Sequence, residues 1–425
     1  MIAEILSVGD ELLIGRTVNN NAAFMGKLLA ATGIETQWLT SVGDQMERLV
    51  SAIETAWNRV DIVLMTGGLG PTHDDITKDA LCRFFNVDMT FHPEIVAEMK
   101  TRYKAREMEM PKIVNNQGLI PAGAELIRNE LGSAFGLIFN RNGKVLIALP
   151  GVPFEMERMM VDSVIPFLKR FSGEHTILMK SIRTAGIIES KLVTEFRRLD
   201  EVRQLAGVAV LPKLTGVELR LTVSHDSREQ AHQIMERAVR ITREDIGQWI
   251  VAVGDVMLED VIGAALTHMN MTVSVAESCT GGLVANRLTN TPGSSKYFIG
   301  GAVCYSNEIK HSLLNVPAEL LNSYGAVSAE VAEAMAEGVR KRMKTDYGVA
   351  TTGIAGPGGA TEKKPVGLAF VAVAGPNGVV SEKVLFNVDR QHNKKRFAQA
   401  SLNLLWKQLP QKYRTLAQKE VDHEG

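Results

Sequence analysis

Residues 274–310 read SVAESCTGGLVANRLTNTPGSSKYFIGGAVCYSNEIK, and this stretch decides both the fold class and the chemistry of the last third of the chain. An apolar strand expected over 271–275 breaks at the turn ESCTGG (277–282), and a helix is expected over 283–288. A second strand is expected over 301–305. Hydroxyl and glycine residues at a strand-to-helix turn present N–H groups at a helix N-terminus, which suits anions and developing negative charge. The stretch predicts an α/β unit with a reactive strand end.

Three side chains of this stretch are expected to converge at the carboxyl ends of the two strands: Ser278, Tyr305 and Lys310. A neutral serine needs a base and donors for the oxyanion. No histidine is close in sequence, and a buried lysine with a lowered pKa can act as the base. Ser278 also suits a helix N-cap, Tyr305 a core position and Lys310 an exposed helix face. Cys279 is a rival nucleophile, because a thiol at a helix N-terminus gains acidity.

Further residues are expected to bind the substrate of this site. Glycines and a small residue would let the backbone approach a ligand, and hydroxyl or guanidinium groups would bind a phosphate or carboxylate. The PGSS segment is also common as a simple turn. The expected set is Thr280, Gly281, Gly282, Gly293, Ser294, Ser295, Thr352, Gly353, Ala355, Gly356 and Arg390.

The first ~170 residues alternate strands with helices, which predicts a parallel sheet covered on both faces. Strands are expected over 2–8, 36–42, 62–66 and 145–149, and helices over 20–31, 46–59 and after Asp75. Ligands of such sheets bind at the carboxyl ends of the strands. The motifs GDELLIG (9–15), VGD (42–44) and TGGLGPTHDDIT (66–77) all fall there.

The motif TGGLGPTHDDIT favours a phosphate site with a hard cation, because it joins glycines to carboxylates and hydroxyls. Asp74 and Asp75 are expected at the start of a helix, with Thr72 and Thr77 beside them. An ordinary turn with a helix cap would have the same composition. Asp10, Glu11 and Asp44 follow two other strands, so five carboxylates would line one rim and call for a divalent metal. His73 is expected to be an exposed turn residue.

Composition excludes several classes of protein. The chain has 425 residues, 45% hydrophobic and 22% charged, with a formal net charge of −1, which predicts two or three globular domains and no broad nucleic-acid face. Cys82, Cys279 and Cys304 lack metal-ligand spacing and suit a reducing cytosol. We expect no signal peptide and no membrane span. We therefore expect a cytoplasmic protein without membrane or direct nucleic-acid partners.

The middle of the chain, residues ~175–250, predicts a small α+β module without a catalytic cluster. Strands are expected over 177–184, 207–211 and 217–224, and helices over 189–199 and 229–241. The charges of 226–244 are typical of a solvated helix face. The last unit is expected to add helices over 258–269, 328–342 and 394–409, with strands over 347–351, 368–374 and 379–387.

The carboxyl-terminal motifs closely resemble nicotinamide mononucleotide deamidases of the PncC type, which form the last domain of the CinA family (competence/damage-inducible protein A). The resemblance rests on 276–310, GAVS (325–328), TGIAGPGG (352–359) and KPVG (364–367). It implies hydrolysis of the carboxamide of nicotinamide mononucleotide, without a cofactor. Ser278 would be the nucleophile, activated by Lys310 and Tyr305, with Thr352 and Arg390 at the substrate. Lys394 and Lys395 occupy a stretch richer in arginine in the family, so we expect them outside the site.

The amino-terminal half resembles the molybdopterin-binding, MoCF-type domain of the same family, through GDELLIG with Asn19 and Asn21, GGLGPTHDDIT, Asn129 with Gly132, and LPGVPFEM (149–156). The resemblance implies a metal-dependent ADP-ribose pyrophosphatase that yields AMP and ribose 5-phosphate. The cofactor would be Mg, Mn or Co, with a monovalent cation as a further candidate. Asn20 and Phe135 depart from the family, and we expect Phe135 to alter the loop beside the substrate. The implied site is Gly67, Gly68, Gly70, Thr72, Asp75 and Glu155, with Asp10, Asp44 and Asp75 at the metal.

The whole chain is expected to form an α/β protein of three domains. Residues 1–172 would be the MoCF-like domain, 173–252 a KH-like connector matched by GIIESKL (186–192), and 253–425 the deamidase domain. The GXXG loop of RNA-binding KH domains is absent, so the connector is expected to be a spacer and an assembly surface of a homo-dimer. The leading hypothesis is a bifunctional enzyme acting on nicotinamide mononucleotide and ADP-ribose. The alternatives are a pterin-cofactor-binding protein and a non-catalytic accessory protein of DNA uptake.

Overall fold

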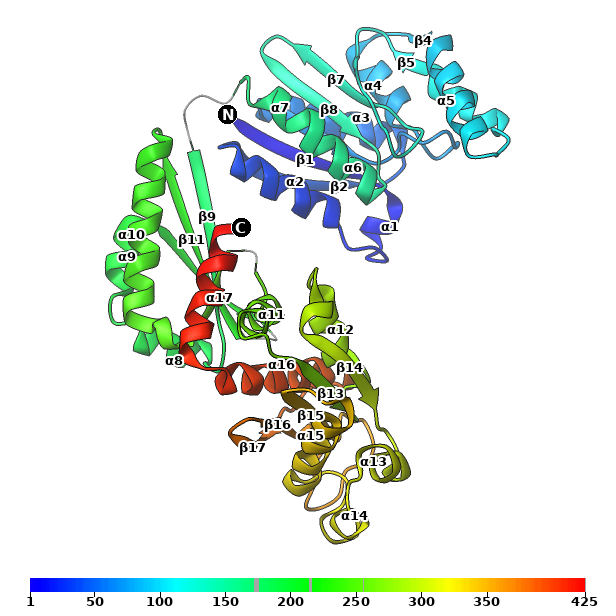
Figure 1. Cartoon of the computed structure of the whole chain (residues 1–425). Coiled ribbons are helices and arrows are strands. Elements are labelled where there is room, and N and C mark those ends of the chain that lie inside the picture. The colour runs from blue at the N-terminus through cyan, green and yellow to red at the C-terminus, as the bar shows by residue number, and fades with distance from the viewer. Residues whose placement is uncertain (172–175, 214–215, 255, 425) are drawn as a thin grey trace. The chain divides into compact units, whose positions relative to one another are not determined.

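The computed structural model describes residues 1–171, 176–213, 216–254 and 256–424 (Figure 1). Two compact units make up the chain. The first comprises Met1–Leu178 with Val223–Gln233, and the second comprises Met179–Thr222 with Ile234–Gly425. Within the described residues, no helix combines the length and the apolar character that crossing a membrane requires.

The first unit is built on a six-stranded sheet in the order β2-β1-β3-β8-β7-β6. Its parallel strands are β1 (Ile2–Val8), β2 (Glu35–Val42), β3 (Ile62–Thr66) and β8 (Lys144–Leu149). The antiparallel strands β7 (Gly136–Arg141) and β6 (Glu125–Ile127) complete one edge. The short strands β4 (Met89–Phe91) and β5 (Leu119–Pro121) pair separately.

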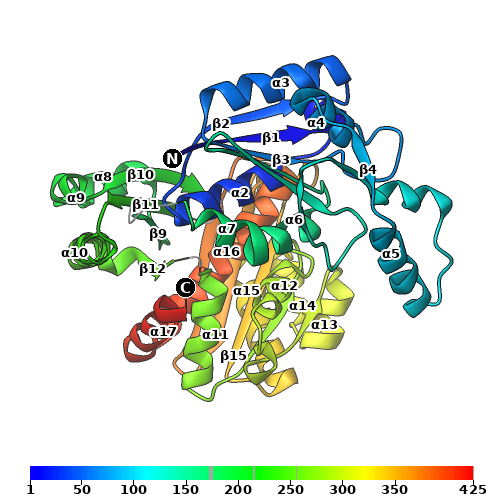
Figure 2. The same cartoon turned by 90° about the horizontal axis from the view of Figure 1, so that it is seen from above.

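Helices cover both faces of this sheet, as the alternating pattern predicted. Along β1, Ala3 and Ile5 pack into one core and Leu6 and Val8 into the other, because successive side chains of a strand point to opposite faces. Figure 2 shows α2 (Asn20–Ala31) and α3 (Met46–Arg59) on opposite sides of the sheet. The other elements are α1 (Asp10–Leu13), α4 (Thr77–Phe85), α5 (Pro93–Ala105), η1 (Lys112–Gly118), α6 (Pro153–Met159), η2 (Met160–Val164) and α7 (Ile165–Leu168).

A four-stranded sheet, β10-β11-β9-β12, forms the middle of the chain. It comprises β9 (Thr176–Thr184), β10 (Gly207–Lys213), β11 (Gly216–His225) and β12 (Ile250–Val253), with α10 (Arg228–Ile246) and η3 (Gly247–Trp249). The helix expected over 189–199 is two helices, α8 (Glu189–Glu195) and α9 (Leu199–Leu205). The break buries Phe196, and the N–H of Arg198 donates to Asp245.

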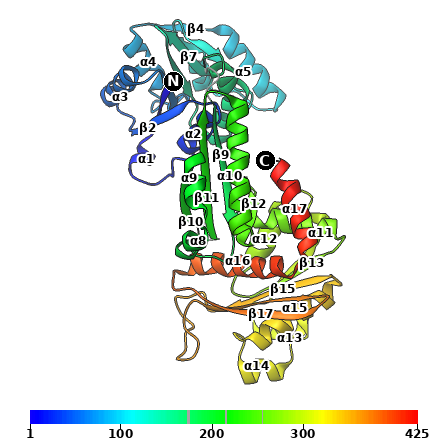
Figure 3. The same cartoon turned by 90° about the vertical axis from the view of Figure 1, so that its left-hand side faces the viewer.

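The rest of the second unit is a five-stranded sheet in the order β14-β13-β15-β16-β17. Strands β13 (Val273–Glu277), β14 (Phe298–Val303) and β15 (Tyr347–Gly353) are parallel, and β16 (Leu368–Gly375) and β17 (Gly378–Leu385) form an antiparallel hairpin. Figure 3 shows α16 (Arg390–Gln408) on one face, and α13 (Asn307–Leu314), α14 (Ala318–Tyr324) and α15 (Ala329–Met343) on the other. The remaining helices are α11 (Leu258–His268), α12 (Leu283–Asn290), η4 (Ser294–Lys296) and α17 (Gln411–Glu424).

Three element boundaries near the reactive turn differ from the sequence prediction. The strand expected over 301–305 is β14, Phe298–Val303, so Tyr305 lies beyond its end. The strand expected over 271–275 is β13, Val273–Glu277, so it runs into the turn itself. The helix expected from 394 begins at Arg390, because Asp389 caps it by accepting the N–H groups of Gln391 and His392. The earlier start adds one helical turn and brings Arg390 onto the helix.

Candidate functional site

The carboxyl ends of three neighbouring parallel strands form the site of the second unit. Ser278 follows β13, Tyr305 lies two residues after β14, and Thr352 lies at the end of β15. Since β14, β13 and β15 are adjacent and parallel, these ends meet at one edge of the sheet. The strand order therefore brings together residues that lie far apart in the sequence.

Lys310 is buried at this edge and contacts Ser278. Its Nζ lies 3.3 Å from Ser278 Oγ, 2.9 Å from the Cys304 carbonyl oxygen and 3.1 Å from the Tyr305 carbonyl oxygen. The side chain is 1% exposed, although it begins on α13. Burial lowers the pKa of the Lys310 amine, because the charged form loses its hydration. The two side chains that sequence reasoning paired are in direct contact.

Tyr305 takes a different position from the one expected of a proton relay. Its ring is 62% exposed, and its hydroxyl accepts a hydrogen bond from Arg390 Nη2 at 3.2 Å. Arg390 Nη1 donates to the Gly356 carbonyl at 2.6 Å. Among the described residues, the phenol makes no hydrogen bond to Lys310, which the Tyr305 backbone carbonyl contacts instead. Arg390 thus links the loop after β15 to the loop after β14.

Glu277 organises the turn that carries Ser278. It is 1% exposed, and its carboxylate accepts the N–H groups of Gly282, Val284 and Ala285 at 2.8–3.1 Å. These are the first donors of α12, so the carboxylate caps the helix from the strand below. Gly281 and Gly282 both have positive φ. Sequence reasoning missed this role, although an acidic residue before a helix start is a usable signal.

The remaining N–H groups of the turn are unused. In the described part of the chain, no hydrogen bond takes the N–H of Thr280 or Gly281. Thr280 is fully buried, and its hydroxyl pairs with Thr351 Oγ1 at 2.7 Å. A buried N–H without a partner is rare in folded proteins. The Thr280 side chain is therefore structural, while its backbone N–H has no partner among the described residues.

Cys279 lies in an apolar environment on the other side of the turn. It is 6% exposed and packs in a small core with Ala355, Ala369 and Phe397. Burial is the main cause that raises the pKa of its thiol to about 12. The thiol is therefore protonated at neutral pH, and the acidity expected from the helix N-terminus is outweighed by desolvation.

The end of β15 and the loop after it hold three further residues of the expected set. The Thr352 hydroxyl is buried and donates to the Ala326 carbonyl at 2.7 Å, so it ties two loops together. Gly353 packs closely against Ala369, and a Cβ there would lie 2.5 Å from the alanine Cβ. Gly356 has a positive φ of 93° and offers its carbonyl to Arg390. These residues build the wall of the site.

Gly293, Ser294 and Ser295 do not join Ser278, and the expectation that they do is wrong for a single chain. They follow α12 and directly precede β14, whose Phe298 pairs with Val273 at the amino end of β13. Ser278 stands at the carboxyl end of the same strand, about 13 Å away along it. Helix α12 runs back across the sheet, so its two ends lie at opposite edges.

Lys394 belongs to the site, contrary to the sequence expectation. A Cβ built on Gly281 would lie 3.4 Å from Lys394 Nζ, so the ammonium sits beside the nucleophile turn. The side chain is half-buried. Lys395 is exposed and makes no such approach among the described residues. The four-residue step from Arg390 places Lys394 on the same helix face, a spacing that could have signalled its position.

The first unit has a cavity of about 410 Å³ at the carboxyl ends of β1, β3 and β8. It includes most of the residues expected there. The expected residues that line it are Glu11, Asp44, Gly67, Gly68, Gly70, Asp74, Asp75 and Glu155. Asp10 joins it through Asp44: each residue's carboxylate accepts the backbone N–H of the other, at 3.1 and 3.2 Å.

Part of the expected metal set fits a cation. Burial raises the pKa of Asp44, and the charges of Asp10, Glu11 and Asp74 raise it further. A divalent cation would relieve this repulsion. Mg²⁺ commonly binds one or two carboxylates together with substrate phosphates, and Asp10 and Asp44 suit that role. Across the described residues, however, no three acidic, histidine or cysteine side chains form a metal-binding group.

Several hydroxyl and acidic groups of TGGLGPTHDDIT are structural. Asp75 accepts hydrogen bonds from the N–H and hydroxyl of Thr72, which does not line the cavity. The buried Thr77 hydroxyl donates to the Gly67 carbonyl at 2.9 Å. Helix α4 begins at Thr77, two residues after the aspartates. Local turns use the hydrogens of both hydroxyls, and the binding of a cation or substrate by these threonines stays a prediction. His73 is exposed, as expected.

The opposite wall of the cavity is held by Glu155. Asn129 Nδ2 donates to its carboxylate at 2.6 Å, while Asn129 Oδ1 accepts the N–H groups of Leu131 and Gly132. Phe135 is 5% exposed and packs in the core. It points away from the cavity, which Ser133 and Ala134 line instead. The ring serves the core, and an effect of Phe135 on the substrate loop stays a prediction.

Lys78 is a residue near this cavity that sequence reasoning missed. It is 6% exposed, and its Nζ donates to Gln117 Oε1 at 3.0 Å. Burial lowers its pKa to about 8, against the opposing charges of Asp75 and Asp79. Nothing in the sequence distinguishes this lysine from a surface one, since its burial depends on the distant segment η1.

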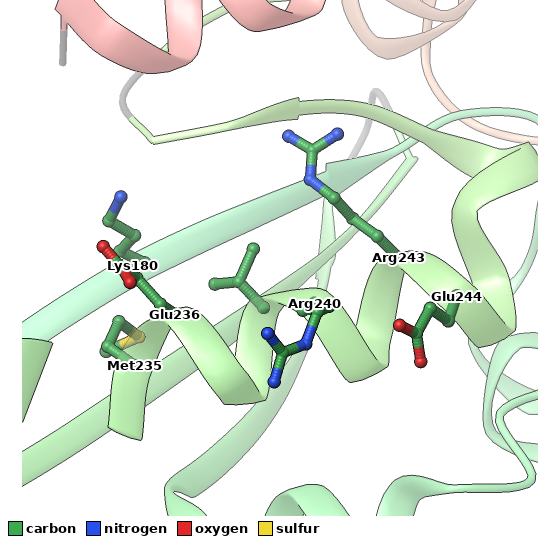
Figure 4. Close-up of a pocket in the computed structure, with 7 residues that line it drawn as sticks. Lys180, Met235, Glu236, Arg240, Arg243 and Glu244 are labelled. Atoms are coloured by element: carbon green, nitrogen blue, oxygen red, sulfur yellow. The ribbon is translucent and has the colours of Figure 1, made fainter. Parts of the chain in front are cut away.

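The middle of the chain has a hollow of about 380 Å³ along α10 (Figure 4). Charged side chains of the helix and Lys180 of β9 surround two apolar ones. The lining residues are Lys180, Met235, Glu236, Val239, Arg240, Arg243 and Glu244. They include no nucleophile and no histidine, which agrees with the expected solvated helix face.

Comparisons with known proteins cover nearly the whole chain. Residues 4–170 match the probable molybdopterin binding domain, 179–252 the damage-inducible protein CinA KH domain, and 255–409 the CinA C-terminal domain. A putative competence-damage inducible protein of Caldicellulosiruptor bescii is 40% identical over 409 residues, which is 96% of this chain and 99% of that protein. A CinA-like protein of Chloroherpeton thalassium is 41% identical over 417 residues, with shares of 95% and 98%.

Among solved structures, competence/damage inducible protein CihA of Agrobacterium tumefaciens is 38% identical to the matched part. The match covers 35% of this chain and 93% of that one, with a TM-score of 0.34.

Proposed function

The chain belongs to the CinA family, and from this premise we propose that its second unit hydrolyses the carboxamide of nicotinamide mononucleotide to nicotinic acid mononucleotide and ammonia. The substrate follows from the resemblance to the PncC-type deamidases. One observation carries the chemistry: a buried lysine amine lies 3.3 Å from the hydroxyl of Ser278.

The burial of Lys310 supports its role as the base in this proposal. A neutral amine has two N–H donors and one lone pair. In that form, the carbonyls of Cys304 and Tyr305 would accept the two donors and the lone pair would face Ser278 Oγ, 3.3 Å away. Burial stabilises this neutral form. The arrangement therefore supports transfer of the serine proton to Lys310 as the oxygen attacks.

In the proposed reaction, Ser278 Oγ attacks the carboxamide carbon and its proton passes to Lys310 Nζ. The carbon–nitrogen bond then breaks, and the nitrogen leaves as ammonia with that proton. An ester joins the nicotinoyl group to Ser278. Water gives a proton to the same amine, attacks the ester and forms the carboxylate, and the proton returns to the serine oxygen. The unused N–H groups of Thr280 and Gly281 would stabilise the oxyanion, each worth about 2.7–4 kcal/mol.

The proposed function is tested by measuring ammonia release from nicotinamide mononucleotide by the full chain and by Ser278→Ala. We expect release by the natural chain and its loss, by at least about a thousandfold, in the variant. Circular dichroism checks that the variant folds. A natural chain that binds the nucleotide without releasing ammonia contradicts the proposal.

We propose a second activity for the first unit, the metal-dependent hydrolysis of ADP-ribose to AMP and ribose 5-phosphate. The raised pKa of Asp44 beside Asp10, on a cavity lined by Gly67, Gly68 and Gly70, supports this proposal. A metal held by Asp10 and Asp44 would supply charge neutralisation for the pyrophosphate. The competing function is binding of a pterin cofactor, since the matching family model describes a probable molybdopterin binding domain. Assays with ADP-ribose and with a pterin substrate, each with Mg²⁺, Mn²⁺ or Co²⁺, distinguish the two.

A further inference from the structure

The nucleophile turn has a cation beside it that the deamidation steps do not use. Lys394 Nζ would lie 3.4 Å from a Cβ on Gly281, and its side chain is half-buried. In the described part of the chain, this ammonium makes no hydrogen bond and no ion pair. A partly desolvated ammonium without a partner is unfavourable, and binding an anion would relieve that cost.

The other basic side chains of the site are already engaged. Lys310 has three oxygen neighbours in the interior. Both terminal nitrogens of Arg390 donate within the protein, to Gly356 and Tyr305. Lys364 Nζ donates to the Tyr324 carbonyl. Unlike these three side chains, Lys394 makes no hydrogen bond within the described part of the chain, so its N–H groups can bind a ligand.

Two other candidates for anion binding are unsuitable. The N–H groups of Gly282, Val284 and Ala285 at the start of α12 already donate to Glu277. Residues 293–295, with the hydroxyls of PGSS, lie at the opposite edge of the sheet within one chain. Of the basic side chains named above, all within the described residues, Lys394 is therefore the one that a mononucleotide at Ser278 finds without a protein partner.

We propose that Lys394 binds the 5′-phosphate of the mononucleotide and so makes this site specific for nucleotides over nucleosides. This inference rests on the proposed deamidase function. Lys394 makes a charge-assisted contact to the phosphate, while Arg390 keeps the surrounding loops in place. Lys394 lies four residues after Arg390 on α16, so one face of this helix carries both the phosphate contact and the contacts to the loops.

The test measures binding, so that it does not depend on catalysis. Calorimetry on the full chain with Ser278→Ala compares nicotinamide mononucleotide with the corresponding nucleoside, which lacks the phosphate. Adding Lys394→Met is expected to weaken nucleotide binding about ten- to a hundredfold and to leave nucleoside binding within about twofold. Lys395→Met is the matched control and is expected to change neither. Lys394→Arg is expected to restore most of the affinity.

The outcomes separate this inference from the proposed function. Equal weakening of nucleotide and nucleoside binding by Lys394→Met would mean that the lysine only supports the turn, and would overturn the inference. Unchanged nucleotide binding would overturn it as well. If the natural chain releases no ammonia but Lys394→Met selectively weakens nucleotide binding, the deamidase proposal fails and the phosphate contact stands.

Discussion

Ser278 and Lys310 are 32 residues apart in the chain and 3.3 Å apart at their reactive atoms. Their environments differ from that of Cys279, which directly follows the serine. The thiol faces an apolar core, and its pKa of about 12 keeps it protonated. At the scale of single residues, the buried thiol and the contact between Lys310 and Ser278 support the hydroxyl as the proposed nucleophile.

A pair of substitutions tests this selection. We expect Cys279→Ala to retain deamidation within about tenfold, because it removes a thiol that does not react, while Ser278→Ala removes activity. Steady-state kinetics of ammonia release, with thermal unfolding as a check on stability, measure both. Turnover retained by Ser278→Ala and lost in Cys279→Ala would assign the reaction to the thiol.

The pH dependence should report the titration of Lys310. Its pKa is lowered by burial, and the neutral amine is the active form, so kcat/KM should rise with pH through that lowered pKa and fall below it. Folding stability follows the same sign, because the unfolded chain binds more protons in this window. An acid limb at or above the ordinary pKa of lysine, or an unchanged profile in Lys310→Met, would remove the lysine from the mechanism.

At the scale of elements, β13 and α12 are joined by a capped turn. Glu277 ends the strand and accepts three N–H groups of the turn and the following helix. The carboxylate thereby fixes the path of Ser278 to Gly282. The strand, the turn and the helix are thereby joined, since the residue that caps the helix belongs to the strand.

Replacing this cap should affect both stability and activity. Glu277→Gln places an amide where three donors converge, so we expect a loss of about 1–3 kcal/mol in the free energy of unfolding and a lower kcat. Urea denaturation and ammonia release are the measurements. Glu308→Gln, in the exposed first turn of α13, is the control and should change stability by less than about 0.5 kcal/mol. A neutral Glu277→Gln would show that the turn holds its shape without the charge.

At the scale of the whole molecule, the two candidate sites lie in separate units with separate cores. Ser278, Lys310 and Lys394 all belong to the second unit, and Asp10, Asp44 and the glycine loop to the first.

Independent sites should be inactivated independently. We expect Asp44→Asn to lower metal-dependent ADP-ribose hydrolysis by more than about tenfold and to leave ammonia release unchanged, with the reverse for Ser278→Ala. A chelator should abolish ADP-ribose hydrolysis and leave ammonia release unchanged. Both activities are measured on the full chain, as ammonia release from nicotinamide mononucleotide and as AMP and ribose 5-phosphate formation from ADP-ribose. Loss of ammonia release after chelation would place a metal in the deamidase chemistry or couple the two units.

The sequence by itself determined the alternation of strands and helices, the motifs at the strand ends and the pairing of Ser278 with Lys310. Those features depend on local periodicity and on side-chain chemistry, which the residues carry with them. Only the tertiary structure decided that Thr72 and Thr77 serve turns, that residues 293–295 stand at the far edge of the sheet, and that Lys394 reaches Gly281. Burial and strand order set these outcomes, and both arise from contacts between segments that are distant in the chain.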